Sequence, residues 1–256
     1  MGSSSKGGWR SFRYKYYMIE TEKLIINRKV YETVRKARQV IEFDTDKPVD
    51  KEVIKDLLEK TYEITPSKNN MAAWQVHVLG PEHQNYKDIL FKGSADNDTL
   101  SNKGTDIPDV GHIRELQGIP RENPVYRCLS TAPYVLIVTQ RQSSLESPYQ
   151  KEAWSRGIFY DPCTEKGLSE SRENICVECG LFAMNLRSLA IERGIDTSFI
   201  CNFNKDLEAE VWKQIPFVDK RVNILISIGY GKQYRRDLYP IKFDYKPSID
   251  KIIKWV

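Results

Sequence analysis

The sequence has no phosphate-binding loop of the form G-x-x-x-x-G-K-[ST] and no G-x-G-x-x-G segment after a predicted strand. It therefore gives no support for an NTPase or for a Rossmann dinucleotide-binding domain. A G-x-S-x-G motif is also missing, which argues against a serine hydrolase of that type. Histidine is scarce, and His77, His83 and His112 do not stand at metal-ligand spacing, so no metal site is expected.

The body of the chain has no excess of positive charge. The 256 residues include 39 Lys and Arg against 35 Asp and Glu. Four basic residues and no acidic ones lie in residues 1–17: Lys6, Arg10, Arg13 and Lys15. Removing these four from 39 leaves 35 basic residues against 35 acidic ones. Nucleic acid is therefore not an expected partner, and only the basic leader favours a nucleic-acid-binding module.

Long apolar runs and a disulfide framework are missing too. No run approaches the roughly 18 to 20 apolar residues that span a bilayer, so no membrane association is expected. The cysteines are odd in number and scattered (128, 163, 176, 179 and 201), which indicates a reducing, cytoplasmic location. Cys176 and Cys179 form a C-x-x-C inside a predicted apolar helix. We expect both to be buried thiols, neither a metal site nor a redox pair.

The pattern of apolar residues predicts one domain over residues 18–256, preceded by a Gly/Ser-rich and then basic, aromatic leader at 1–17. Predicted helices span about 22–40, a segment after the capping residue Asp50, 81–91, and 205–214. The longest predicted helix runs from Ser169 or Ser171 to Arg193, with Gly194 as its C-cap. Predicted strands span 74–78, 132–139, 197–201 and 222–228.

Three other segments suggest functional roles. Residues 93–125 and 141–168 are predicted to be irregular excursions, which are typical of lids at functional sites. The longest helix is apolar nearly all round, which indicates the centre of a domain or an interface. The chain ends in an extended arm whose apolar tip is expected to pack on another subunit: Ile249, Ile252, Ile253 and Trp255.

The most informative stretch is Thr65 to Pro81, TPSKNNMAAWQVHVLGP. A polar loop with Ser67, Lys68 and Asn70 leads directly into the strand that begins at Trp74. A loop anchored on a core strand can present both side chains and backbone N–H groups to a ligand. An ordinary connection between a helix and a strand has the same composition, so the loop alone leaves both interpretations open.

The order of these motifs resembles the nitroreductase superfamily of FMN-dependent oxidoreductases. The resemblance rests on the Pro-Ser-x-x-Asn-x-x-x-Trp spacing at Pro66–Trp74 and on the long apolar helix followed by Gly-hydrophobic-Asp and a short strand. The sequence Ile-Gly-Tyr after the last strand agrees with it. The resemblance covers roughly residues 35–255.

The resemblance implies an α+β fold with a mostly antiparallel central sheet flanked by helices. It also implies a homodimer with the long helix in the interface, an exchanged C-terminal arm, and two FMN sites between the subunits. Ser67, Lys68 and Asn70 would lie along the flavin. The turn after the long helix would present backbone N–H groups to it, at Phe199, Ile200, Cys201 and Asn202, where Cys201 and Asn202 replace a common Glu-Gly pair.

The chain departs from the family most clearly at the phosphate clamp. The family's Arg-Arg-Ser-x-Arg segment falls on residues 37–41, where Arg38 and Gln39 are the candidate cofactor ligands and Ala37 and Ile41 replace arginines. The basic residue expected in the C-terminal arm falls near Lys246, and Ala72-Ala73 replaces the usual Gln-Pro before the Trp.

The resemblance implies an enzyme that uses NADH or NADPH to reduce a small, electron-poor acceptor, such as a nitro compound or quinone, by ping-pong hydride transfer through FMN. Both substrates would use one pocket in turn, which would account for the missing nicotinamide-binding fold. The reduced clamp also fits an alternative, a flavin-binding protein of the same fold with little or no turnover.

Overall fold

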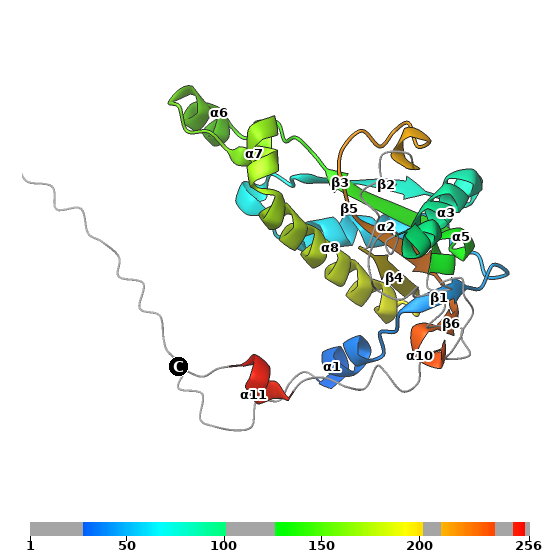
Figure 1. Cartoon of the computed structure of the whole chain (residues 1–256). Coiled ribbons are helices and arrows are strands. Elements are labelled where there is room, and N and C mark those ends of the chain that lie inside the picture. Colours follow the sequence, from blue (N-terminus) through cyan, green and yellow to red (C-terminus); the bar gives the residue numbers. More distant parts are fainter. Residues whose placement is uncertain (1–27, 101–125, 202–210, 239–247, 254–256) are drawn as a thin grey trace, which may run out of the picture.

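The computed structural model describes residues 28–100, 126–201, 211–238 and 248–253. At its centre is an antiparallel sheet of four strands in the order β2-β3-β5-β4, which Figure 1 shows crossing the middle of the molecule. The strands are β2 (Trp74–Leu79), β3 (Tyr134–Gln140), β4 (Asp196–Ile200) and β5 (Val222–Gly229). All four were predicted from the sequence, with ends displaced by two residues at most.

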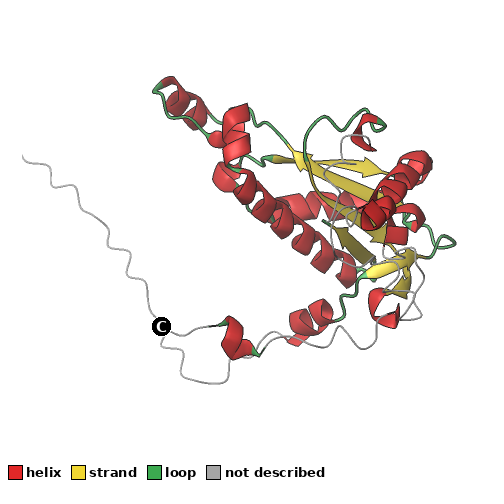
Figure 2. Ribbon diagram, in the orientation of Figure 1, coloured by secondary structure: helices red, strands yellow, loops and turns green. Residues whose placement is uncertain are grey.

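Helices cover both faces of this sheet, as Figure 2 shows: α2, α8, α3 and α5 span Lys51–Ile64, Arg172–Glu192, Gln84–Leu100 and Arg127–Thr131. Successive side chains of a strand point to opposite faces, so β3 contributes to two cores. Leu136 and Val138 pack in the core with α2 and α8, whereas Val135 and Ile137 pack in the core with α3 and α5. The mixed architecture of helices and antiparallel sheet is the predicted one.

The ends of α2 and α8 follow local signals in the sequence. Asp50 Oδ1 accepts a hydrogen bond from the Glu52 N–H at 3.0 Å and caps α2. Ser171 precedes α8, and Gly194 follows it with a φ of 71°. Glycine reaches this left-handed region without a Cβ clash, so the chain can turn directly from α8 into β4.

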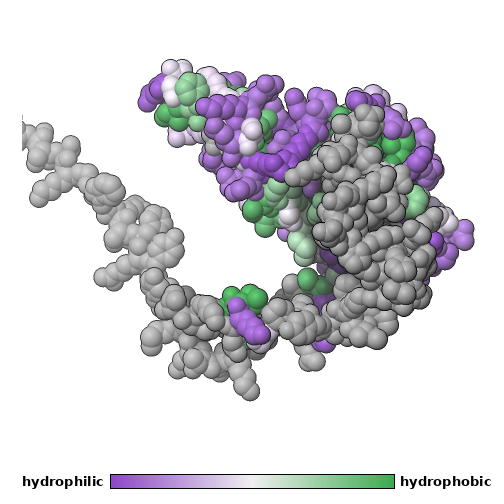
Figure 3. Space-filling model, in the orientation of Figure 1, coloured by the Kyte–Doolittle hydropathy of each residue, from purple (hydrophilic) through white to green (hydrophobic). Residues whose placement is uncertain are grey.

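Only part of the apolar surface of α8 is covered within one chain. Phe182 and Leu186 are buried against the sheet, whereas Val177, Leu181 and Met184 are exposed. Figure 3 shows apolar surface on the side along which α8 runs. The helix has a mean hydropathy of 1.2, enough by length and composition to cross a membrane, which the sequence analysis had not anticipated. Core helices of soluble proteins meet the same criterion, so this property is weak evidence for a membrane span.

A second, two-stranded sheet pairs β1 (Val40–Phe43) with β6 (Gly231–Tyr234). The prediction of one helix over about 22–40 is wrong at its C-terminal end, because α1 covers only Arg28–Arg35 and Val40 belongs to β1. Val40 and Ile41 are fully buried. Pairing with β6 and burial of these β-branched side chains outweigh their helical spacing.

The segments expected to be irregular contain helices where the structure describes them. α3 continues through residues 93–100, and residues 101–125 lie outside the described part. Segment 141–168 forms α6 (Pro148–Ser155), η4 (Asp161–Cys163) and most of α7 (Glu165–Glu170). The capping box of Ser147 and Gln150 starts α6 and was an available signal. In Figure 1, α6 and α7 project beyond the first turns of α8.

Four short elements complete the described structure: η1 (Lys68–Asn70), η2 (Pro81–His83), α10 (Arg235–Leu238) and α11 (Ile249–Ile252). α11 lies apart from the sheet in Figure 1, with Ile249, Ile252 and Ile253 exposed. The leader 1–17, residues 205–210 of a predicted helix, and Trp255 lie outside the described residues, so the expectations for them stay predictions.

Gly229→Ala is expected to lower the free energy of unfolding. A Cβ at this position would lie 2.6 Å from Pro133 Cδ and 2.8 Å from Phe43 Cδ1. Overpacking of this kind costs about 1 to 3 kcal/mol. Urea unfolding followed by circular dichroism measures the change, and an unaltered midpoint would contradict the close contact between the end of β5 and β1.

Candidate functional site

The loop between α2 and β2 has an unusual backbone conformation. Asn69, Asn70 and Ala72 have φ values of 56°, 55° and 42°. This left-handed region disfavours residues with a Cβ, although asparagine tolerates it best. Ser67 closes the loop, because its Oγ accepts a hydrogen bond from the Ala72 N–H at 3.1 Å. The predicted ligand-binding side chains of Ser67, Lys68 and Asn70 are thus carried by a loop of defined shape.

Side chains from the segment after β3 hold this loop in place. Arg141 Nη2 donates a hydrogen bond to the Met71 carbonyl oxygen at 2.9 Å, and Ser143 Oγ donates to the same oxygen at 2.7 Å. Gln150 Nε2 donates to the Asn69 carbonyl oxygen at 3.3 Å. A strained backbone persists only where its surroundings over-determine it, and these contacts provide that support.

A buried carboxyl group on α8 provides a further contact. Glu178 Oε1 accepts a hydrogen bond from the Lys68 N–H at 2.7 Å. Its Oε2 is buried and has no hydrogen-bond partner among the described residues. Burial raises the pKa of Glu178, and the hydrogen bond and positive charge of Lys68 oppose this shift. The helix therefore fixes the first residue of η1.

The second group of predicted residues lies at the end of β4. Gln39 Nε2 donates hydrogen bonds to Ser198 Oγ at 2.7 Å and to the Phe199 carbonyl oxygen at 3.0 Å, which ties the start of β1 to β4. The Ile200 side chain is buried, so only its main chain is available to a ligand. Cys201 is exposed. Asn202 and Lys246 lie outside the described residues.

Few of the five expected clamp positions, 37–41, have a side chain that could bind a phosphate. Arg38 is exposed, and its guanidinium carbon lies 5.4 Å from the centre of the Tyr234 ring. Ile41 is fully buried in β1, so this position faces the core and an arginine there could not reach a ligand without disrupting it. Arg38 and Gln39 remain the candidate ligands of this segment.

The expectation for the C-x-x-C is wrong for one of its two cysteines. Cys179 is buried, but Cys176 is exposed. Asn223 lies between them: its Nδ2 donates to Cys179 Sγ at 3.5 Å, and its Oδ1 accepts from Cys176 Sγ at 3.8 Å. Burial raises the pKa of Cys179 to about 12, so this thiol stays protonated.

The predicted residues form two groups at opposite edges of the sheet. Ser67, Lys68 and Asn70 precede the edge strand β2, whereas Phe199 and Cys201 belong to the other edge strand, β4, and the residue that follows it. Three strand spacings separate these edges, about 14 Å. Within one chain the structure therefore brings Arg38 and Gln39 to the end of β4 but does not bring the loop before β2 to the same place.

A groove runs beside the β2 edge. It has a volume of about 360 Å³, and its lining is mainly apolar, including Leu58, Tyr62, Trp74, Val76, Val78 and Phe182. The Trp74 ring packs on Phe182 with centroids 4.7 Å apart. Such a groove fits apolar side chains better than a charged group.

The sequence analysis missed Arg141, Glu178 and Arg187 as candidate site residues. The stretch Ile175–Ala190 of α8 is uncharged except for Glu178 and Arg187. A charge in a buried helix is expected to have a specific partner, and this signal could have identified both residues. Arg141 had no comparable signal, because it directly follows a strand, where charged residues are common.

Comparison with known proteins now identifies the family. The sequence model of the nitroreductase family matches residues 34–230, which is most of the chain. The protein therefore belongs to the nitroreductase family. No curated protein matches it in sequence.

Solved structures of similar fold agree with this assignment. A nitroreductase-like protein from Streptococcus mutans has a TM-score of 0.59 at 17% identity, covering 90% of this chain and 100% of that one. A candidate NAD(P)H:FMN oxidoreductase from Staphylococcus epidermidis has a TM-score of 0.58 at 18% identity, covering 89% and 95%. A candidate nitroreductase from Exiguobacterium sibiricum, solved in complex with FMN, has a TM-score of 0.56 at 21% identity, covering 89% and 97%. At these identities the likeness concerns the fold.

Glu178→Gln is expected to stabilise the protein more as pH rises. The pKa of Glu178 is raised above its ordinary value of 4.5, so its contribution to stability is greatest below 4.5 and is lost as pH rises through the raised pKa. Glutamine keeps the acceptor for Lys68 without the buried charge. The gain in unfolding free energy over wild type should therefore grow as pH rises above 4.5 and through the raised pKa of Glu178.

Urea unfolding across this pH range measures the difference between the two proteins. Glu173→Gln, which changes an exposed carboxylate in the first turn of the same helix, is the matched control. A pH-independent difference between Glu178→Gln and wild type would contradict the burial of this charge.

Proposed function

We propose that this protein is an FMN-dependent oxidoreductase that uses NADH or NADPH to reduce a small, electron-poor acceptor. The observation that carries the proposal is a pair of hydrogen-bonded segments, the loop 67–72 and the end of β4 with Gln39 and its neighbour Arg38, in a chain of the nitroreductase family. One relative of the same fold was solved in complex with FMN, and another is named as an NAD(P)H:FMN oxidoreductase.

The residues present fit this cofactor. A phosphate monoester needs cationic donors, and Arg38 has an exposed guanidinium that pairs with no carboxylate among the described residues. A planar ring with polar edges needs hydrogen-bonding groups. The exposed loop residues Lys68 and Asn70 and the half-buried Ser67 are rich in them. The donor set therefore suits an anionic, planar ligand.

A bound FMN would supply the redox chemistry, accepting a hydride from NAD(P)H and passing it to the acceptor. The protein residues bind and orient the ligand. Arg38 would hold the phosphate, Gln39 keeps the start of β1 against β4, and the fixed loop at 67–72 would lie along the ring. Its shape is set before binding by Arg141, Ser143 and Glu178, which reduces the ordering cost of ligand binding.

We further propose that the active form is a homodimer. The two ligand-facing groups lie at opposite edges of one sheet, so a second copy is the simplest source of the missing half of each site. Val177, Leu181 and Met184 leave α8 with an exposed apolar face. The apolar groove beside β2 fits an apolar segment such as the exposed isoleucines around α11 of a second copy.

The proposed activity is tested by the visible spectrum of the purified protein and by its reaction with nicotinamide cofactors. A flavin spectrum is expected, with bleaching by NADH or NADPH in anaerobic stopped-flow and recovery when a quinone or nitro compound is added. Protein without flavin that also fails to take up added FMN would overturn the proposal. Bound flavin that neither nucleotide bleaches would make the chain a flavin-binding protein without turnover.

Val177→Asp should weaken the dimer. Val177 is 63% exposed in one chain, and burying such a side chain in an interface is worth about 1.5 to 3 kcal/mol. A charge there would add a desolvation cost. Light scattering over a dilution series should therefore show a dimer for wild type and a shift toward monomer for the variant.

Phe217→Asp is the control, because it places the same charge at a residue that packs on His77 and Tyr86, away from α8. A wild-type monomer with flavin bound would contradict the homodimer proposal.

A further inference from the structure

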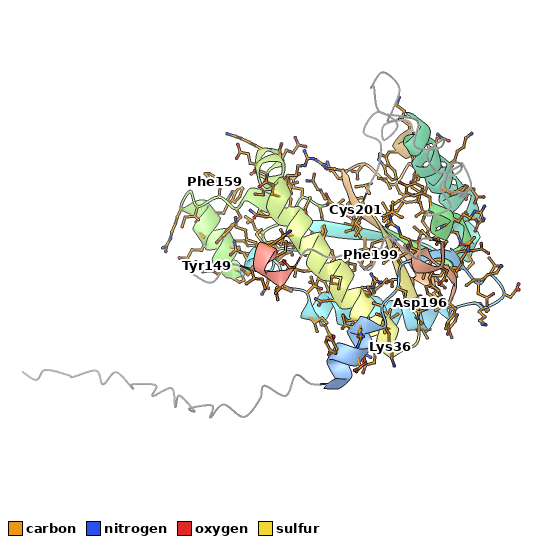
Figure 4. All side chains as sticks on the ribbon, turned by 60° about the horizontal axis from the view of Figure 1, so that its bottom comes forward. Lys36, Tyr149, Phe159, Asp196, Phe199 and Cys201 are labelled. Carbon is orange, nitrogen blue, oxygen red and sulfur yellow. The ribbon has the colours of Figure 1, made fainter. Side chains whose placement is uncertain are left out.

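A second guanidinium lies beside the end of β4, to which the segment of Arg38 is hydrogen-bonded through Gln39. Arg187 on α8 places its guanidinium carbon 5.1 Å from the centre of the Phe199 ring. The Phe199 carbonyl oxygen accepts a hydrogen bond from Gln39, the residue next to Arg38. Figure 4 shows Cys201, Phe199 and Asp196 following one another along β4 beside α8, with Lys36 beyond the lower end. Arg187 and the segment that carries Arg38 therefore both contact Phe199.

Arg187 has the surroundings of an anion-binding group. It is half-buried, and this burial lowers the pKa of its guanidinium. No carboxylate forms an ion pair with it in the part of the chain that the structure describes. The negative charge of Asp196 raises the pKa of Arg187 and so opposes the effect of burial. Asp196 Oδ2, however, already accepts hydrogen bonds from the Gly231 N–H and the Tyr234 hydroxyl, both at 3.0 Å.

Both guanidinium groups are held over aromatic rings. Arg38 lies over Tyr234 and Arg187 over Phe199. Stacking restrains a planar guanidinium and leaves its N–H donors free at the edge, where they can make paired, charge-assisted hydrogen bonds to an oxyanion. Two such forks, neither paired with a carboxylate among the described residues, favour a doubly charged oxyanion as their ligand.

We propose that Arg187 is the second phosphate ligand of this protein and replaces the clamp arginines that Ala37 and Ile41 do not provide. The proposal rests on the proposed function, since its ligand is the phosphate monoester of the flavin cofactor. Ala37 has no charge and Ile41 faces the core, so the charge must come from another element. α8 supplies it at Arg187, one of only two charged residues in the stretch Ile175–Ala190.

Comparison of FMN with riboflavin, which lacks the phosphate, tests this assignment. Flavin-free protein is titrated with each compound, and binding is followed by flavin fluorescence quenching. Wild type should prefer FMN. Arg187→Met should weaken FMN binding about ten- to a hundredfold, because one charge-assisted contact is lost. Riboflavin binding should change little, and Arg187→Lys, which keeps the charge, should retain part of the preference.

The controls separate this inference from the proposed function. Arg172→Met removes an exposed guanidinium from the same helix about 22 Å away and should leave the preference for FMN unchanged. Equal weakening of both flavins by Arg187→Met would show that Arg187 supports the fold or the interface, and unchanged FMN binding would show that the phosphate is held elsewhere. Either result would overturn the role of Arg187 but leave the proposed function standing. Failure of wild type to bind either flavin would overturn the proposed function together with it.

Discussion

The rest of the structure depends on the packing of α8 across the central sheet. Phe182, Leu186 and Ala190 bury one side of the helix against β3 and β5, and Phe182 also contacts Trp74 at the start of β2. Because this apolar contact fixes the helix, the polar residues that it carries acquire fixed positions as well. Glu178 can then accept a hydrogen bond from the loop before β2, while Arg187 stacks on Phe199 of β4. A hydrophobic contact therefore determines where the charged groups stand.

Much of this fold could be predicted from sequence, because its main elements have strong local signals. Asp50 and Gly194 mark helix ends through backbone chemistry, and the buried strands have continuous apolar runs. The pairing of β1 with β6 joins residues nearly two hundred positions apart, and no local pattern at Val40 or Ile41 encodes it. Their helical spacing was therefore misleading, since a tertiary contact decided the conformation.

The candidate site was predictable only in part. The polar loop with Ser67 and Asn70 was found because it leads straight into a strand, and its left-handed asparagines suit that position. Its supports were not found, because hydrogen bonds from Arg141 and Glu178 to backbone atoms leave no spacing in the sequence. The placement of the clamp at Arg38 stays a prediction, and the burial of Ile41 could be seen only once β1 was known to be a strand.

The spacing of the two polar contacts on α8 limits where insertions and deletions can occur in this chain. Glu178 and Arg187 are nine residues apart, which on a straight helix is about 13.5 Å and two and a half turns. Inserting or deleting one residue between them would rotate one end by about 100° relative to the other and break the contact with the loop or with Phe199. The number of residues between Glu178 and Arg187 is therefore constrained more tightly than the identity of those residues. Changes in chain length are tolerable only outside this interval, in the segments that join α8 to its neighbours.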